Sequence, residues 1–134
     1  MNIIADTNLL VRFFTKDNKE QAQKVIEIFT QSSKIIIPTN VLCELVWVLS
    51  SSYKFHADFI AERIAKLIEN PKIIINHTEI KFGLKILEQN GDFADGINAI
   101  SGIQMALGQE LRFVSFDKKA VKILQKLGVN AVEL

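Results

Sequence analysis

The chain has few of the features that mark secreted, disulfide-bonded or membrane proteins. Its 134 residues include one cysteine, Cys43, which excludes an internal disulfide. The segment around Cys43 is apolar, and this favours a small core residue in a reducing compartment. No apolar run approaches the length that spans a bilayer, and the N-terminus has no signal-peptide pattern. We therefore expect a cytoplasmic protein with no membrane contact.

Neither sign of charge is in excess. Lysine and arginine number 16 and aspartate and glutamate 15, a net charge of +1, so no overall basic field indicates nucleic acid binding. Any contact with a polyanion must come from a local patch. The two histidines, His56 and His77, lack zinc-ligand spacing and are expected at the surface. With no repeat or linker, the sequence predicts one domain over residues 1–134.

Predicted strands and helices alternate along the chain. Short β-branched runs predict strands at residues 2–6, 34–37, 73–75, 112–116 and 129–134. Apolar residues at helical spacing predict a helical turn at 9–14 and helices at 21–30, 39–50, 57–69, 79–87, 93–107 and 118–127. This alternation predicts an α/β fold whose central, mostly parallel sheet has four to five strands, with helices on both faces.

Two acids follow predicted strands directly. Asp6 ends the run Ile3-Ile4-Ala5, and Asp117 ends the run at residues 113–116. Ligands of open α/β sheets bind outside the carboxyl ends of the strands, so both acids are expected at that edge. The alternative is that each acid merely caps the helix after it, a position that aspartate favours.

A third acid, Glu44, lies in the helix predicted at residues 39–50. This helix is apolar nearly all round, so it is expected to be largely buried, with Trp47 in the core. A buried carboxylate needs a compensating partner, and neither lysine nor arginine occurs between Lys34 and Lys54. A metal ion could provide that compensation. The alternative is that Glu44 faces a gap in the surface.

The fourth acid, Asp95, has an alternative reading of its own. Asp92 fits a helix N-cap, which makes Asp95 the third helical residue, as in a capping box. If Asp6, Glu44, Asp95 and Asp117 all met at one edge, a cation would have to offset their repulsion. Ligands that are all oxygen atoms suit Mg²⁺ or Mn²⁺.

Four short motifs carry a resemblance. They are Asp6-Thr7-Asn8 after the first strand, Pro38-Thr39 with Glu44 five residues later, Phe93-Ala94-Asp95, and Ser115-Phe116-Asp117. In this order, over the whole chain, they resemble a PIN-domain ribonuclease, and most closely a VapC-type toxin of a bacterial toxin–antitoxin pair. The resemblance implies a three-layer α/β domain in which Asp6, Glu44, Asp95 and Asp117 line one Mg²⁺ pocket.

The resemblance also implies a function and partners. The expected activity is hydrolysis of RNA phosphodiester bonds, with transfer RNA as one substrate class among several in the family. The expected partners are a second copy of the chain, in a homodimer, and a small antitoxin that blocks the site. One departure is that Gly96 and Gly102 stand where the family has better helix formers, and each should weaken its helix by roughly 1 kcal/mol.

Further polar residues are candidates for a supporting role. Thr7, Asn8 and Ser115 could orient ligands or phosphate, or could serve only as caps and turn residues. The basic side chains after the first acid could contact the RNA backbone or form a solvated face, and they are Arg12, Lys16, Lys19 and Lys24.

Two rival classes share the strand-end acid. A Mg²⁺-binding, non-catalytic receiver module needs a phospho-accepting aspartate at the end of its central strand, where this chain has Asn76 and His77. An aspartyl phosphatase needs a second acid two residues after its nucleophile, where this chain has Asn8. The motifs therefore favour the nuclease.

Overall fold

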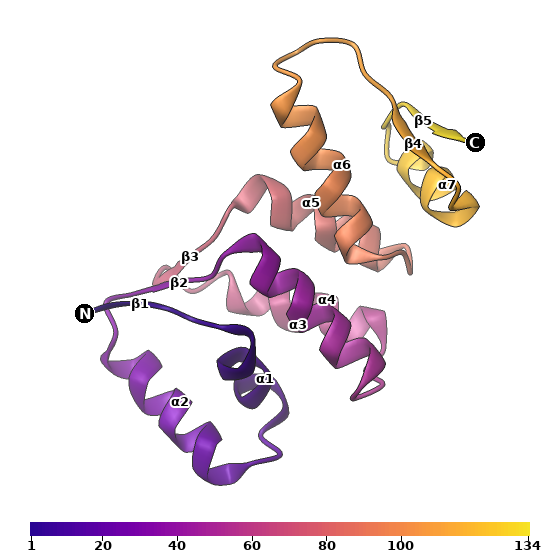
Figure 1. Cartoon of the computed structure of the whole chain (residues 1–134). Helices are drawn as coiled ribbons and strands as arrows, with labels where there is room; N and C mark the ends of the chain where they lie inside the picture. The colour runs from indigo at the N-terminus through magenta and orange to yellow at the C-terminus, as the bar shows by residue number, and fades with distance from the viewer. The chain divides into compact units, whose positions relative to one another are not determined.

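The computed structural model describes residues 1–134 and contains seven helices and five strands (Figure 1). All strand pairings are parallel, which confirms the α/β class expected from the sequence. The residues form two compact units, 1–76 and 77–134. The single domain over residues 1–134 stays a prediction. No helix has both the length and the hydropathy needed to span a bilayer.

The first unit is built on a three-stranded parallel sheet in the order β1-β2-β3. The strands are β1 (Asn2–Ile4), β2 (Lys34–Ile36) and β3 (Ile73–Ile74). Ile35 pairs with Ile73 in register, and both side chains are buried. Their neighbours along the strands, Ile36 and Ile74, are 36% and 41% exposed, because successive residues point to opposite faces of a sheet.

Four helices complete this unit, and local capping explains where they begin. They are α1 (Thr7–Thr15), α2 (Lys19–Gln31), α3 (Thr39–Ser51) and α4 (Ala57–Leu67). The Asp6 carboxylate caps α1, so a full helix forms where the sequence indicated a single turn. Asn18 caps α2, which therefore begins earlier than residue 21. Helix α1 packs against both α2 and α3.

The burial expected for α3 is wrong on one side of the helix. Leu42, Leu45 and Leu49 are almost fully buried, but Glu44 is exposed and Trp47 is 67% exposed. The helix is apolar nearly all round, so its sequence could not indicate which face packs inward. Because Glu44 is exposed, water solvates its charge. Burial of this carboxylate therefore gives no reason to expect a metal ion beside it.

The second unit contains three helices and two strands. They are α5 (His77–Glu88), α6 (Phe93–Met105), β4 (Phe113–Ser115), α7 (Lys118–Lys126) and β5 (Ala131–Glu133). Helices α5 and α6 pack along each other, and α7 packs on the β4–β5 pair (Figure 1). Val121 and Leu124 of α7 join Ile86 of α5 in one buried cluster. Gly128 follows α7 in the left-handed conformation, as its position after the helix predicts.

Glycine allows α5 and α6 to approach closely. A Cβ atom on Gly96 would lie 2.5 Å from Cγ1 of Ile86, and one on Gly83 would lie 2.6 Å from Cε2 of Phe93. Ile86 and Phe93 are both buried and have little room to move. The expectation that Gly96 only weakens its helix is therefore wrong, because this glycine is required by packing. Gly102 meets nothing within 4 Å, so the propensity argument still applies there.

The two glycines of α6 should respond to alanine in opposite ways. We expect Gly96→Ala to lower the free energy of unfolding by about 1–2 kcal/mol, since overpacking costs more than alanine's helix propensity returns. Gly102→Ala should raise it by up to about 1 kcal/mol, because its site is open. Urea unfolding of both variants beside the parent measures this. Equal effects of the two substitutions would contradict the close packing of α5 on α6.

Candidate active site

In the first unit, Asp6 stands at the carboxyl end of β1, as expected. Its Oδ1 accepts a hydrogen bond of 3.0 Å from the backbone N–H of Leu9, so Asp6 does serve as a helix cap. The carboxylate is exposed and lines a depression of about 260 Å³. Asn8, Arg12 and Lys24 line the same depression. Capping uses one carboxylate oxygen, and the other is available to a ligand.

Thr7 connects the first acid motif to Glu44. Its hydroxyl donates a 3.0 Å hydrogen bond to Oε2 of Glu44, which joins the start of α1 to α3. The structure thereby holds the Glu44 carboxylate beside the residue that follows Asp6. This contact suits the supporting role expected for Thr7, and that role stays a prediction.

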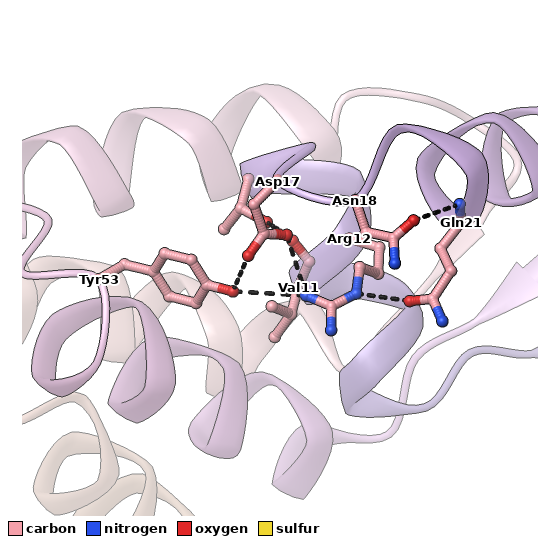
Figure 2. A network of polar contacts seen from close by, with 7 residues as sticks. Val11, Arg12, Asp17, Asn18, Gln21 and Tyr53 are labelled. Atoms are coloured by element: carbon pink, nitrogen blue, oxygen red, sulfur yellow. Dashed lines mark hydrogen bonds and ion pairs between the residues drawn. The ribbon is translucent and has the colours of Figure 1, made fainter.

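Arg12 belongs to a polar network that ties three segments together (Figure 2). Its Nη1 pairs with Oδ1 of Asp17 at 3.0 Å, and its Nε donates to Oε1 of Gln21 at 2.6 Å. The Tyr53 hydroxyl donates to Oδ2 of Asp17 at 2.6 Å. Hydrogen bonds from Tyr53 and Thr15, and then the charge of Arg12, lower the pKa of Asp17. Arg12 therefore has a structural role in addition to lining the Asp6 depression.

Lys16 lies away from the depression that Asp6 lines. It follows α1 in the left-handed conformation and lines a separate depression with Phe13, Phe14 and Arg63. Among the supporting residues expected in the first unit, Asn8, Arg12 and Lys24 line the same depression as Asp6. Thr7, Lys16 and Lys19 do not. Both histidines are exposed, as expected, and Cys43 is only half-buried.

In the second unit, three acids line one cavity of about 120 Å³. We call this the acid pocket; its polar lining residues are Asp92, Asp95, Asp117 and Lys119, and Ile86 and Leu124 are among its apolar ones. Asp92 comes before α6 and Asp117 before α7, so the start of each helix carries an acid into the pocket. The pocket therefore brings Asp117 together with Asp92 and Asp95, which lie 22 or more positions before it in the sequence.

Two of these acids are held by local hydrogen bonds. Asp92 accepts from the N–H of Ala94 at 2.8 Å, and Asp117 accepts from the N–H of Ala120 at 3.0 Å, so both cap helices. The hydroxyl of Ser115 accepts a 2.9 Å hydrogen bond from the N–H of Asp117. Ser115 therefore helps to orient the segment that carries Asp117.

Asp95 differs from the other three candidate acids. Asp6, Glu44 and Asp117 each accept a hydrogen bond from the protein, and the half-buried Asp95 carboxylate accepts none. Burial, and then the charges of Asp92 and Asp117, raise the pKa of Asp95. A carboxylate whose ionised form is disfavoured in this way gains from a bound cation.

The candidate acids lie in both units. Asp6 and Glu44 belong to residues 1–76, and Asp95 and Asp117 belong to residues 77–134. No three histidine, cysteine, aspartate or glutamate side chains are already arranged as ligands of one ion. The joint site of all four acids stays a prediction. The candidate ligand atoms are all oxygen atoms, and the Asp95 carboxylate accepts no hydrogen bond. Oxygen ligands of this kind are the ones that Mg²⁺ and Mn²⁺ prefer.

The sequence patterns did not indicate Lys119 as a residue of the acid pocket, and they indicated Asp92 only as a helix cap. Lys119 lines the pocket together with the acids, two positions after Asp117. Its place in the first turn of a helix, where a positive charge is disfavoured, was the available signal.

Comparison with known proteins identifies a family. The model of the PIN domain family matches residues 3–123, which include all four candidate acids. No curated protein and no solved structure matches the chain significantly. PIN domains are generally metal-dependent nucleases, and they typically use a divalent cation such as Mg²⁺. Since the match covers most of the 134 residues, the chain belongs to the PIN domain family.

Proposed function

We propose that this PIN domain is a Mg²⁺-dependent endoribonuclease and the toxin of a toxin–antitoxin pair. The observation that carries the proposal is the Asp95 carboxylate, which has no hydrogen-bond donor and a pKa raised by burial and by its acidic neighbours. A cation beside such a group would offset the penalty that burial and the neighbouring charges place on its ionised form. Mn²⁺ has the same preference for oxygen ligands and could replace Mg²⁺.

The roles of the acids follow from their charge. Asp95 and Asp117, with Asp6 and Glu44 from the first unit, would hold the ion that draws the RNA phosphate into an otherwise repulsive site. When bound, Mg²⁺ would polarise a phosphoryl oxygen and lower the pKa of a bound water for in-line attack. Thr7 would orient Glu44 through their 3.0 Å hydrogen bond, and Ser115 would orient the Asp117 segment.

The proposed partners follow from the same charges. The cognate antitoxin would place a basic side chain among the acids, which relieves their repulsion without catalysing hydrolysis. We further propose a cytoplasmic homodimer, with transfer RNA as one substrate class to test.

Brief expression of the chain in bacterial cells tests the proposal. We expect growth arrest and new RNA ends at a small set of positions, mapped by sequencing RNA ends before and after induction. Asp6→Asn is the matched control, since it keeps the shape and a capping oxygen but loses the charge. Co-expression of the neighbouring small gene should suppress the new ends. Identical RNA ends in the parent and in Asp6→Asn would refute the nuclease.

A further inference from the structure

A groove lined by lysines lies in the second unit. Four side chains of α7 line it, Lys118, Lys119, Lys122 and Lys126, together with Gln89 at the end of α5 and Ile123. The volume of this lysine groove is about 540 Å³, and all four lysines are exposed. No acidic residue lines it.

The lysine groove concentrates positive charge that no ion pair in the protein neutralises. None of the four lysines forms an ion pair, and the one polar contact is from Nζ of Lys126 to Oε1 of Gln89 at 3.0 Å. The whole chain has a net charge of only +1, so this excess is local. A local patch of this kind is what binding to a polyanion requires in a nearly neutral protein.

Two of these lysines stand where the helix dipole disfavours positive charge. Lys118 and Lys119 occupy the first turn of α7, where the helix dipole disfavours positive charge, and no acid is present in that turn. Lys118, Lys122 and Lys126 are spaced four residues apart, so like charges are neighbours along the helix. Folding does not require positive charge at Lys118 and Lys119, and a polyanion bound there would neutralise it.

The lysine groove adjoins the acid pocket. Lys119 and Ile123 line both. A strand that lay along the lysines would therefore arrive at Asp95 and Asp117. Lysines four residues apart are separated by about 6 Å along the helix axis, so neighbouring phosphates of one strand can each meet a lysine.

We propose that the lysine groove binds the phosphate backbone of single-stranded RNA and leads it into the acid pocket. This inference rests on the proposed function for the identity of the polyanion. Lys119 holds the phosphate nearest the acids, and Lys122 and Lys126 hold the phosphates that follow. Binding here depends on the charge of the backbone and not on base sequence.

Equilibrium binding in chelator tests the groove separately from cleavage. The probe is a fluorescein-labelled 12-nucleotide oligouridylate, and its anisotropy is measured with the full chain in EDTA over a range of salt concentrations. The test variant is Lys119→Gln/Lys122→Gln/Lys126→Gln. The matched control is Lys34→Gln/Lys54→Gln/Lys81→Gln, which removes the same charge at exposed lysines outside the groove.

The parent and control should bind alike, and the groove variant should bind more weakly. Each lost phosphate contact reduces the slope of log affinity against log salt by about 0.7, so three contacts reduce it by about 2. If the affinities of the parent and the groove variant for RNA become equal near 1 M salt, the groove variant should bind RNA about 100-fold more weakly at 0.1 M salt. Equal losses in the groove and control variants would overturn the proposal. The proposal would also be overturned if the groove variant bound RNA as well as the parent does but no longer bound polyglutamate. That result would indicate an acidic protein partner.

A thermal melt distinguishes a binding role from a structural one. The groove variant should melt at the same temperature as the parent or higher, because it removes repulsive charges from α7. A lower melting temperature together with weaker binding would overturn the assignment. If the parent binds RNA in the groove but leaves it uncut with Mg²⁺, the nuclease fails and the groove stands. If the parent cuts RNA and the groove variant binds it normally, the groove fails and the nuclease stands.

Discussion

Replacing Asp95 by asparagine should abolish RNA cleavage while the protein stays folded. Asp95 is the candidate acid with no hydrogen-bond donor, so the substitution removes the charge and breaks no contact within the protein. We expect a loss of at least about 100-fold, the upper end of the effect of removing a group that only supports a metal ligand. The measurement is the initial rate of cleavage of a labelled RNA with saturating Mg²⁺.

Asp92→Asn is the matched control for this substitution. Asp92 lines the same pocket and caps α6 through the N–H of Ala94, and asparagine caps about as well as aspartate. We expect this variant to keep most of its activity. Equal loss in both variants, with normal circular dichroism, would show that Asp95 has no special role.

The same Asp95→Asn variant should be slightly more stable than the parent in the absence of metal. The pKa of Asp95 is raised in the fold, so its stabilising contribution is complete below the unfolded pKa and is lost as pH rises through the folded pKa. At neutral pH the ionised group therefore opposes folding. Solvent screening and the favourable dipole of α6 limit the gain to roughly 0.5 kcal/mol. Melts in EDTA at pH 7 measure it, and a clear destabilisation would contradict crowding of the acids.

Removing the metal should stop cleavage completely. The acid pocket holds three carboxylates and one lysine, so the protein itself supplies too little positive charge to bring a phosphate against Asp95. We expect no cleavage in EDTA and full recovery when excess Mg²⁺ or Mn²⁺ is added. Full activity in EDTA would exclude the metal mechanism.

The melting temperature measures binding of the same ion independently of RNA cleavage. A ligand that binds only the folded state stabilises it, by about 2.7 kcal/mol at a hundredfold excess over its dissociation constant. Mg²⁺ should therefore raise the melting temperature of the parent. The rise should be smaller for Asp95→Asn, which lacks the unsatisfied carboxylate. Equal shifts in the two proteins would mean that Mg²⁺ binds elsewhere.

The sequence by itself determined the order of the elements and the caps that start several of them. Asp6, Asp92 and Asp117 each precede a run at helical spacing, and in the structure each side chain accepts a hydrogen bond from the helix that follows. The short β-branched runs form strands, and their pairing is parallel because one or two helices separate each strand from the one that it pairs with. These features depend on residues close together in the chain, and local patterns are enough to predict them.

Only the tertiary structure decided which side chains are buried and which acids are crowded. Helix α3 is apolar on all sides, so packing alone placed Leu45 inside and left Glu44 and Trp47 exposed. Gly96 is required because α5 lies against α6, a contact that helix propensity cannot reveal. Burial raises the pKa of Asp95, and the charges of Asp92 and of Asp117, which lies more than 20 residues away in the sequence, raise it further. Such effects depend on distances in space, which the spacing of residues along the chain does not determine.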